Sequence, residues 1–395
     1  MKKSGGQARS GARAQRVALL VDTSSSWGRR IIHGVHNYLL KHGPWQLFLE
    51  ARGMEETPQM PRGWEGDGVI ARISSLQMAE QLAALRVPVV NVSAIELQGN
   101  RFCRVVNDLN ATAEMAFSYF ANRGFRHFAY FSLLGLSYVA IQQQAFQRAV
   151  RAAGCECDVY AVKPRSGAEP DWNLNLAKLG QWLKRLPKPL AVLTWNASSS
   201  REIIYACQVA GLLVPEQVAV LSGSDDDVLC EHVHPPISGI LVAAEQCGYE
   251  AAELLDRLLH GKSPPQKPTL IPPLSIITRQ STDTLAINDG AMIKALSFIR
   301  QNAGQKINVR EVARQAGVCR RVLERRFTQS LGRSPALEIR RVHFERAKQL
   351  LVETELPIPD VAEAAGFGSP EYLAYVFKNE LGETPLHYRK AIRGR

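Results

Sequence analysis

The chain has 395 residues, of which 46% are hydrophobic and 22% are charged, and its formal net charge is +11. This composition is that of an ordinary folded protein and no apolar run reaches the length of a membrane span, so a membrane protein is excluded and two or three domains are expected. The apolar run at 17–21 is too short for the core of a signal peptide, which predicts a cytoplasmic protein.

The positive charge is concentrated at the two ends of the chain. Residues 1–16 carry five Lys or Arg and no acid, and residues 285–395 carry 19 Lys or Arg against 12 Asp or Glu, whereas the region between them is almost neutral. A basic C-terminal segment indicates a polyanionic partner. The basic tail 1–16 is rich in Gly, Ala and Ser and is predicted to be disordered, either without a role or with a weak contact to nucleic acid.

Residues 17–280 alternate short β-rich runs with helical stretches. Strands are predicted at 17–21, 68–71, 87–92, 128–131, 190–193, 218–221 and 274–278, and helices at 29–40, 111–123, 145–153 and 202–210. Such alternation predicts parallel sheets with helices on both faces. In open sheets of this kind, ligands bind beyond the carboxyl ends of the strands.

A change of character marks the end of this region. Prolines accumulate between 264 and 273, the polar segment Ser281–Thr284 follows, and only helical periodicity remains after Asp289. We therefore expect a linker at 281–289 and a separate all-helical domain at 290–395.

This C-terminal region contains an internal repeat. Val312–Val318 has a counterpart in Val361–Phe367 at an offset of 49, and Phe327–Pro335 has one in Phe377–Pro385 at an offset of 50. Each copy predicts a helix, a glycine-containing turn and a second helix, and the amphipathic stretch 336–353 would join the two units as a long helix.

Capping residues mark where the helices of the two units begin. In the first unit, Asn308 with Glu311 three residues later forms a capping-box pattern, and Gly317 supplies the turn. In the second unit, Ser369 is a favourable N-cap and Pro370 fits the first helical position.

The second helix of the first unit is the most basic element of the chain. It carries Arg320, Arg321, Arg325 and Arg326 on what we expect to be its exposed face. Arginine binds phosphate or reads guanine bidentately in the major groove, so the row predicts contact with double-stranded DNA; the alternative is a solvated basic helix face. The corresponding helix of the second unit is much less basic.

Residues 290–395 resemble the AraC-type DNA-binding domain, which has two helix-turn-helix units joined by a long helix. The matching residues include Ala313, Gly317, Leu323, Phe327, Gly332, Pro335, Ala362, Gly366, Phe367, Phe377, Gly382 and Pro385. The resemblance implies base contacts from Arg321, Glu324, Arg325, Pro370, Glu371, Ala374 and Tyr375. Cys319 departs from the family, which often has a Ser or Thr cap at this position.

Residues 17–280 resemble the LacI-type periplasmic-binding-protein fold, in which a ligand cleft separates two lobes. The supporting segments are Asp108 with the helix after it, Gly124–Phe125, Gly211–Pro215 and Gly223–Asp226. A sensor of this type followed by an AraC-type domain resembles the xylose-operon regulator family. The expected fold is therefore a two-lobe α/β sensor with an all-α C-terminal domain.

Five residues are candidates for binding a ligand in the cleft. The resemblance implies that Asp225 binds the ligand and that Asn196 lies near the matching polar position. Trp27 would offer an aromatic face or serve as a core or hinge residue, and Arg72 ends a predicted strand. Gln142 falls where LacI-type sensors commonly have an arginine that holds sugar hydroxyls, which is a departure from that family.

The sequence has no GxGxxG, P-loop, GxSxG or HExxH motif, so we expect neither an enzyme nor a cofactor or metal. The favoured hypothesis is a homodimeric, sugar-responsive activator of a carbohydrate (xylose-like pentose) catabolic operon, with DNA, a monosaccharide and RNA polymerase as partners. The alternative is a regulator whose sensor takes a non-sugar ligand or no longer binds one.

Overall fold

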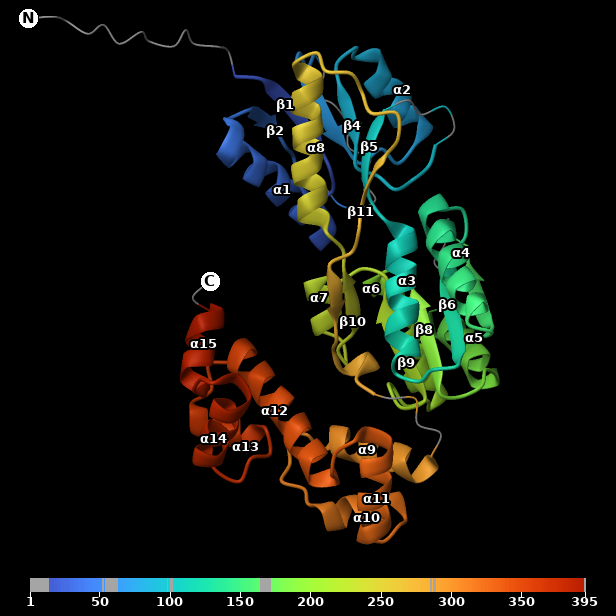
Figure 1. Ribbon diagram of the computed structural model, residues 1–395, viewed down its shortest axis with the longest axis vertical. Coiled ribbons are helices and arrows are strands. Elements are labelled where there is room, and N and C mark those ends of the chain that lie inside the picture. The colour runs from blue at the N-terminus through green and yellow to red at the C-terminus, as the bar shows by residue number, and fades with distance from the viewer. Residues whose placement is uncertain are drawn as a thin grey trace, which may run out of the picture.

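The computed structural model describes residues 14–51, 53, 63–97, 99, 102–163, 172–284, 286 and 289–393. Most of the predicted tail 1–16 lies outside these residues. The described chain forms two α/β lobes followed by a set of helices, as predicted for the fold class (Figure 1). Within these ranges no helix is both long and apolar enough to cross a membrane.

The first lobe is a six-stranded parallel sheet in the order β11-β5-β4-β3-β1-β2. Its elements are β1 (Arg16–Leu20), α1 (Ser26–His42), β2 (Gln46–Phe48), β3 (Gly68–Ala71), α2 (Leu76–Ala84), β4 (Val89–Asn91), β5 (Cys103–Asn107), α8 (Ala244–Leu259) and β11 (Thr269–Ile271). Helices α1 and α8 pack on one face of the sheet and α2 on the other. The central strands β1, β3 and β4 are buried on both faces, which explains their continuous apolar runs.

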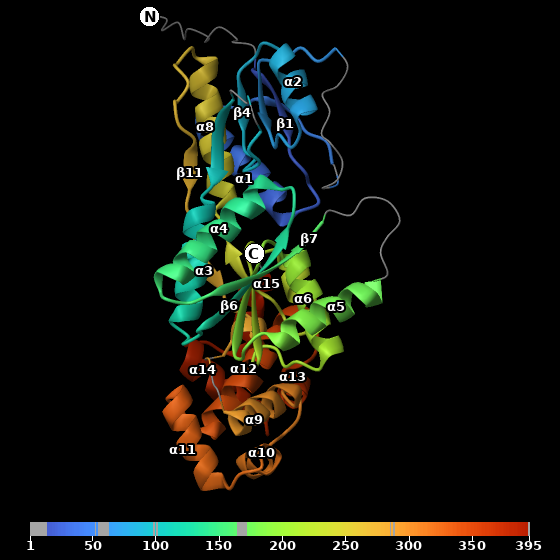
Figure 2. The same ribbon diagram turned by 90° about the vertical axis from the view of Figure 1, so that its right-hand side faces the viewer.

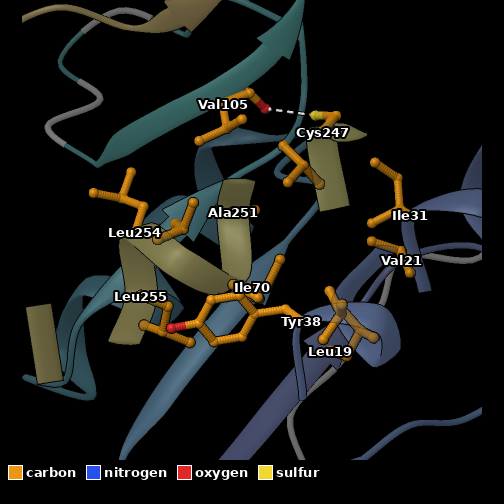
Figure 3. Close-up of a cluster of buried hydrophobic side chains, with 14 of the residues drawn as sticks. Leu19, Val21, Ile31, Tyr38, Ile70, Val105, Cys247, Ala251, Leu254 and Leu255 are labelled. Atoms are coloured by element: carbon orange, nitrogen blue, oxygen red, sulfur yellow. Dashed lines mark hydrogen bonds between the residues drawn. The ribbon is translucent and has the colours of Figure 1, made fainter. Parts of the chain in front are cut away.

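Helices α1 and α8 share a core with the first sheet. Figure 3 shows Ile31 and Tyr38 of α1 and Leu255 of α8 around Leu19 and Ile70 of the central strands. Gly34 and Gly248 lie where the two helices touch: a Cβ on either would lie about 2 Å from a backbone oxygen of the other helix. Small residues at these positions therefore allow the close approach that closes this lobe.

The second lobe has its own sheet, in the order β12-β10-β9-β8-β6-β7, and only β12 runs antiparallel to its neighbour. Its elements are α3 (Leu109–Ala121), β6 (His127–Leu133), α4 (Ser137–Ala152), β7 (Cys157–Val162), α5 (Trp172–Arg185), β8 (Leu190–Thr194), α6 (Ala197–Ala210), β9 (Val218–Ser222), α7 (Asp227–Glu231), β10 (Ser238–Leu241) and β12 (Ser275–Ile277). The chain crosses between the lobes after β5, β10 and β11. The segments at these crossings are the natural hinges for relative motion of the lobes.

The helical region begins close to the second lobe. Residues 280–282 form a short 3-10 turn, in which Ser281 and Thr282 are fully buried and hydrogen-bonded to Ser238 of β10. The amide of Ala286 then donates to the carbonyl of Arg123 at 2.8 Å. The start of the predicted linker is therefore anchored to the second lobe.

Seven helices follow within the described residues 289–393: α9 (Gly290–Gln301), α10 (Val309–Ala316), α11 (Arg320–Leu331), α12 (Pro335–Glu353), α13 (Ile358–Ala364), α14 (Pro370–Leu381) and α15 (Pro385–Arg393). They enclose two apolar clusters, one around Phe327 and one around Phe377. Helix α12 contributes to both, so it joins two helix-turn-helix units, α10–α11 and α13–α14. In Figures 1 and 2 the second lobe lies between the first lobe and α9–α11.

Candidate functional site

A cavity of about 200 Å³ lies between the two lobes, and all five predicted ligand residues line it. Trp27 comes from the start of α1, Arg72 follows β3, Gln142 lies in α4, Asn196 caps α6 and Asp225 follows β9. Four of the five thus lie at or next to helix starts or strand ends, as expected for an open parallel sheet.

Three aromatic side chains line the cavity from both lobes. Trp27 belongs to the first lobe, whereas Tyr138 and Trp195 belong to the second and pack edge to face, with ring centroids 6.2 Å apart. Burial raises the pKa of Tyr138, and the nearby Arg72 guanidinium partly opposes this. Aromatic faces of this kind accept the C–H surface of a small polar ligand.

Two cavity residues still have hydrogen-bonding capacity. No hydrogen-bond partner for the Arg72 guanidinium occurs among the residues that the structure describes. Asn107 accepts a 2.9 Å hydrogen bond from Trp27 Nε1, and its own Nδ2 is buried without a partner in the described part of the chain. Because an unpaired buried amide is costly, Nδ2 is a ready donor to a ligand acceptor.

Asp225 and Gln142, in contrast, already have partners within the second lobe. The carboxylate of Asp225 has a side-chain exposure of 1% and lies 2.6 Å from Arg279 Nη1. Its other oxygen is 4.0 Å from Arg30 of α1. Gln142 Oε1 accepts a 2.8 Å hydrogen bond from Tyr130 Oη. Asp225 is therefore charge-compensated before any ligand arrives, which the sequence pattern did not predict.

The start of α1 contacts the second lobe directly at the cavity. The Ser26 amide donates to Asp226 Oδ2 at 3.1 Å, and the Ser26 hydroxyl donates to the Asp225 carbonyl at 3.2 Å. Arg29 lies 3.7 Å from Asp227. These contacts join residues about 200 positions apart in the chain, and they depend on how closely the lobes approach each other.

In the first helix-turn-helix unit, the predicted capping box of Asn308 and Glu311 is present, and Gly317 adopts the left-handed conformation with φ 69°. Cys319 caps α11 without a side-chain hydrogen bond, in line with its departure from a Ser or Thr cap.

The four arginines of α11 differ in their partners. Arg320 donates to Glu324 at 2.8 Å, so these two predicted contact residues neutralise each other in the free protein. Arg326, expected on the exposed face, is instead half-buried and bound to Asp289 at 2.7 Å. Arg321 and Arg325 are exposed and have no carboxylate partner in the part of the chain that the structure describes. These two guanidiniums are therefore available to DNA.

In the second unit, Ser369 caps α14 and Pro370 occupies its first turn, as predicted. The hydrogen bond to its own backbone amide and that to Ser369 lower the pKa of Glu371, which is fully exposed. Ala374 is partly exposed, and Tyr375 has an exposed fraction of 59%. All four predicted contact residues therefore lie on the accessible side of the helix.

Three family models match this chain: the XylR N-terminal domain over residues 16–108, the periplasmic binding protein-like domain over 117–282 and a helix-turn-helix domain over 312–391. The xylose operon regulatory protein of Escherichia coli K12 is 30% identical over 95% of this chain and 96% of its own length. The chain belongs to the xylose operon regulatory protein family.

Other members and solved structures agree with this assignment. The Haemophilus influenzae xylose operon regulatory protein is 28% identical over 95% of this chain and 98% of its own length. The solved structure of a xylose-binding transcription activator has a TM-score of 0.79 at 29% identity, covering 96% of this chain and 98% of that one. A LacI-type regulator from Alkaliphilus metalliredigens, at 16% identity and a TM-score of 0.52, shares the sensor fold over 69% of this chain.

The relatives named above are transcription regulators. The expected AraC-type, DNA-binding class of regulator is thereby confirmed. The roles of the individual cleft and helix residues stay predictions. Asn107, Tyr138 and Trp195 were missed, although Trp195 directly precedes Asn196 at the end of β8 and the strand end was a usable signal.

Proposed function

We propose that the protein is a sugar-responsive regulator whose inter-lobe cavity binds a monosaccharide of the pentose class and which activates transcription of a carbohydrate catabolic operon. The names of the family members point to xylose as the first ligand to test. The observation that carries the proposal is the cavity between the lobes, with aromatic faces from both lobes and polar groups of Arg72 and Asn107 that have no partner within the described chain.

The cavity chemistry suits a polyhydroxylated ring. The indole of Trp27 and the ring of Tyr138 provide surfaces for C–H groups, while Arg72 and the Asn107 amide donate to ring or hydroxyl oxygens. Asn196 and Gln142 add amide groups on the second lobe. A ligand that contacts both lobes at once favours the closed arrangement, because only that arrangement makes all of its contacts.

Closure of the two lobes would affect DNA binding through a homodimer. The ligand strengthens the contacts between the start of α1 and residues 225–227, which changes the angle between the lobes. The second lobe carries the helical region, so the lobe angle sets the separation of two DNA-binding regions in a homodimer. Residues 290–395 then bind DNA and recruit RNA polymerase, residues 17–280 sense the ligand, and 281–289 connect the two.

The test combines ligand binding with operator binding. Melting temperature is measured with D-xylose, L-arabinose, D-ribose and D-glucose, and DNA affinity is measured with and without the sugar that stabilises most. We expect one pentose to raise the melting temperature in a concentration-dependent manner. Arg72→Ala should reduce this shift, whereas Arg151→Ala, on the exposed end of α4, should leave it intact. No shift with any sugar would favour a non-sugar ligand or a sensor without one.

A further inference from the structure

The two helix-turn-helix units present different chemistry at equivalent positions. Helices α11 and α14 both have 12 residues, and both end at a glycine in the left-handed conformation. The repeat offset of 50 places Leu373 and Phe377 at the buried positions of Leu323 and Phe327. The same offset places Tyr375 where the first unit has Arg325, the exposed guanidinium available to DNA.

A row of aromatic rings runs from the core of the second unit to this exposed position. Phe367, 7% exposed, packs against Tyr372 with ring centroids 5.9 Å apart. Tyr372 in turn stacks on Tyr375 at 6.3 Å, with an angle of 15° between the rings. Tyr372 and Tyr375 have exposed fractions of 45% and 59%. We call these two residues the tyrosine pair.

Ring contacts restrict the tyrosine pair before any partner binds. Tyr372 is braced by a core residue and Tyr375 is braced by Tyr372, so little side-chain freedom remains to be lost on binding. The pair presents an aromatic surface with polar hydroxyl groups, the kind of side chain that is enriched where proteins bind partners. Their position in the repeat indicates that the partner is the one that α11 contacts.

The charge of α14 disfavours the phosphate backbone as the target of the pair. Helix α11 carries four arginines and one glutamate, whereas α14 carries Glu371, Lys378 and Glu380. Glu371 is exposed and directly precedes Tyr372, so a negative charge lies beside the pair at neutral pH. A carboxylate is repelled by phosphate but accepts a hydrogen bond from the exocyclic amine of cytosine or adenine on the groove floor.

The geometry points to thymine as the base that the tyrosine pair recognises: we infer that α14 reads its half-site through apolar contact of Tyr372 and Tyr375 with thymine methyl groups in the major groove. This inference rests on the proposed DNA-binding function. The methyl group is the only apolar feature that a base edge presents in the major groove, so an aromatic surface there selects thymine. The first unit reads by charged hydrogen bonds and the second by apolar surface.

The experiment starts from duplexes selected from a random pool by the full-length protein. In the best duplex, each thymine is replaced by deoxyuridine, which removes only the methyl group. Arg325→Ala identifies the half-site of α11, because that variant changes base preference there. In the other half-site we expect at least one replacement to weaken wild-type binding about fourfold, the effect of burying one methyl group.

Variants assign the effect to the tyrosine pair. Tyr375→Ala and Tyr372→Ala should bind the thymine and deoxyuridine duplexes equally, while Tyr375→Phe should retain the difference because it keeps the ring. Arg325→Ala should also retain it. Circular dichroism verifies that Tyr375→Ala, a change at an exposed position, keeps its helix content.

Three results would overturn the inference while leaving DNA binding intact. These are equal wild-type affinity for all thymine and deoxyuridine duplexes, a thymine preference that survives both alanine variants, and alanine variants that bind DNA normally but fail to activate transcription. The last would show that the pair contacts RNA polymerase. A wild-type protein that selects no sequence at all would instead refute the proposed function itself.

Discussion

Arg300 of helix α9 and Glu216, which precedes β9, form an ion pair with both side chains almost fully buried, at 6% and 3% exposure. The same guanidinium donates to the carbonyl of Asp283. Asp283 also pairs with Arg341 of α12. Charged groups therefore connect the second lobe, the connecting segment and the helix that joins the two helix-turn-helix units.

Replacing only one partner of this ion pair should lower the free energy of unfolding. Glu216→Gln leaves the Arg300 guanidinium buried without its counter-charge, and we expect the free energy of unfolding to fall by about 3–5 kcal/mol. The matched control is Glu380→Gln, which removes the exposed partner of Arg340 and should cost less than about 1 kcal/mol. Urea denaturation measures both, and equal small costs would show that Arg300 is rehydrated.

Glu338 should make stability depend on pH in the acidic range. Burial raises the pKa of Glu338, but the hydrogen bond and charge of Arg341 and the charge of Arg333 outweigh it, so the pKa lies below its ordinary value of 4.5. The folded state thus binds the proton more weakly than the unfolded state. The contribution is fully present above pH 4.5 and is lost as pH falls through the folded pKa.

The measurement is the free energy of unfolding of the wild type and of Glu338→Gln between pH 3 and pH 7. Glu338→Gln should be less stable at neutral pH, and the difference should narrow as the pH falls below 4.5. The exposed Glu345 supplies the control, since Glu345→Gln should change stability little at any pH. A constant difference for Glu338→Gln would show that its charge does not stabilise the fold.

Sequence periodicity predicted the fold class and the strands β1, β3, β4, β6, β8, β9 and β12, because strands buried on both faces leave continuous apolar runs. The strands β2, β5, β7, β10 and β11 and the helices α2, α5, α7 and α8 were missed; of these, β2 and β11 pair with their neighbours through only three residues each. Helix α4 begins at Ser137, eight residues before its predicted start, and Tyr138 of that extra stretch lines the cavity.

Partners of cleft residues were harder to predict than the residues themselves. Asp225 was identified as a cleft residue, but its partner Arg279 lies 54 positions further along the chain, just after β12. Local spacing carries no information on such a pair, which depends on β12 returning to the second sheet. The same holds for Asn107 and Trp27, which are brought together at 80 positions' separation.

Arg321 and Arg325 should contribute separately to DNA recognition. Both are exposed and free of carboxylate partners in the described chain, so neither must break an ion pair to bind. If each reads a base, its change to alanine should cost about 1–3 kcal/mol on the cognate site and relax specificity at one position. Competition with randomised duplexes measures this. An equal loss of affinity on every sequence would indicate phosphate contact only. Arg326→Ala removes the ion pair with Asp289 and serves as the comparison for effects on helix stability.

A fragment of residues 285–395 should fold without the sensor. Its two apolar clusters consist entirely of residues from 291 onward, and Arg300, which loses Glu216, becomes exposed to water rather than buried alone. We expect a helical fragment that binds DNA more weakly than the full chain, because the proposed homodimer would gain from binding two sites at once. Circular dichroism showing little helix would mean that the second lobe is needed for folding.

Asp225→Asn should separate a structural role from a ligand-binding one. The change keeps one oxygen acceptor but removes the charge opposite Arg279, which still pairs with Glu231 at 3.1 Å and donates to the Ile237 carbonyl at 3.0 Å. We therefore expect a loss of about 1.5–3 kcal/mol in the free energy of unfolding without ligand.

If the Asp225 carboxylate also accepts hydrogen bonds from ligand hydroxyls, the sugar-induced rise in melting temperature should disappear in Asp225→Asn. The control is Asp360→Asn, which changes an exposed carboxylate of α13 that does not line the cavity and should leave that rise intact. A less stable Asp225→Asn protein that keeps the full sugar response would show that Asp225 only positions Arg279, and that Arg72 and Asn107 supply the polar contacts to the ligand.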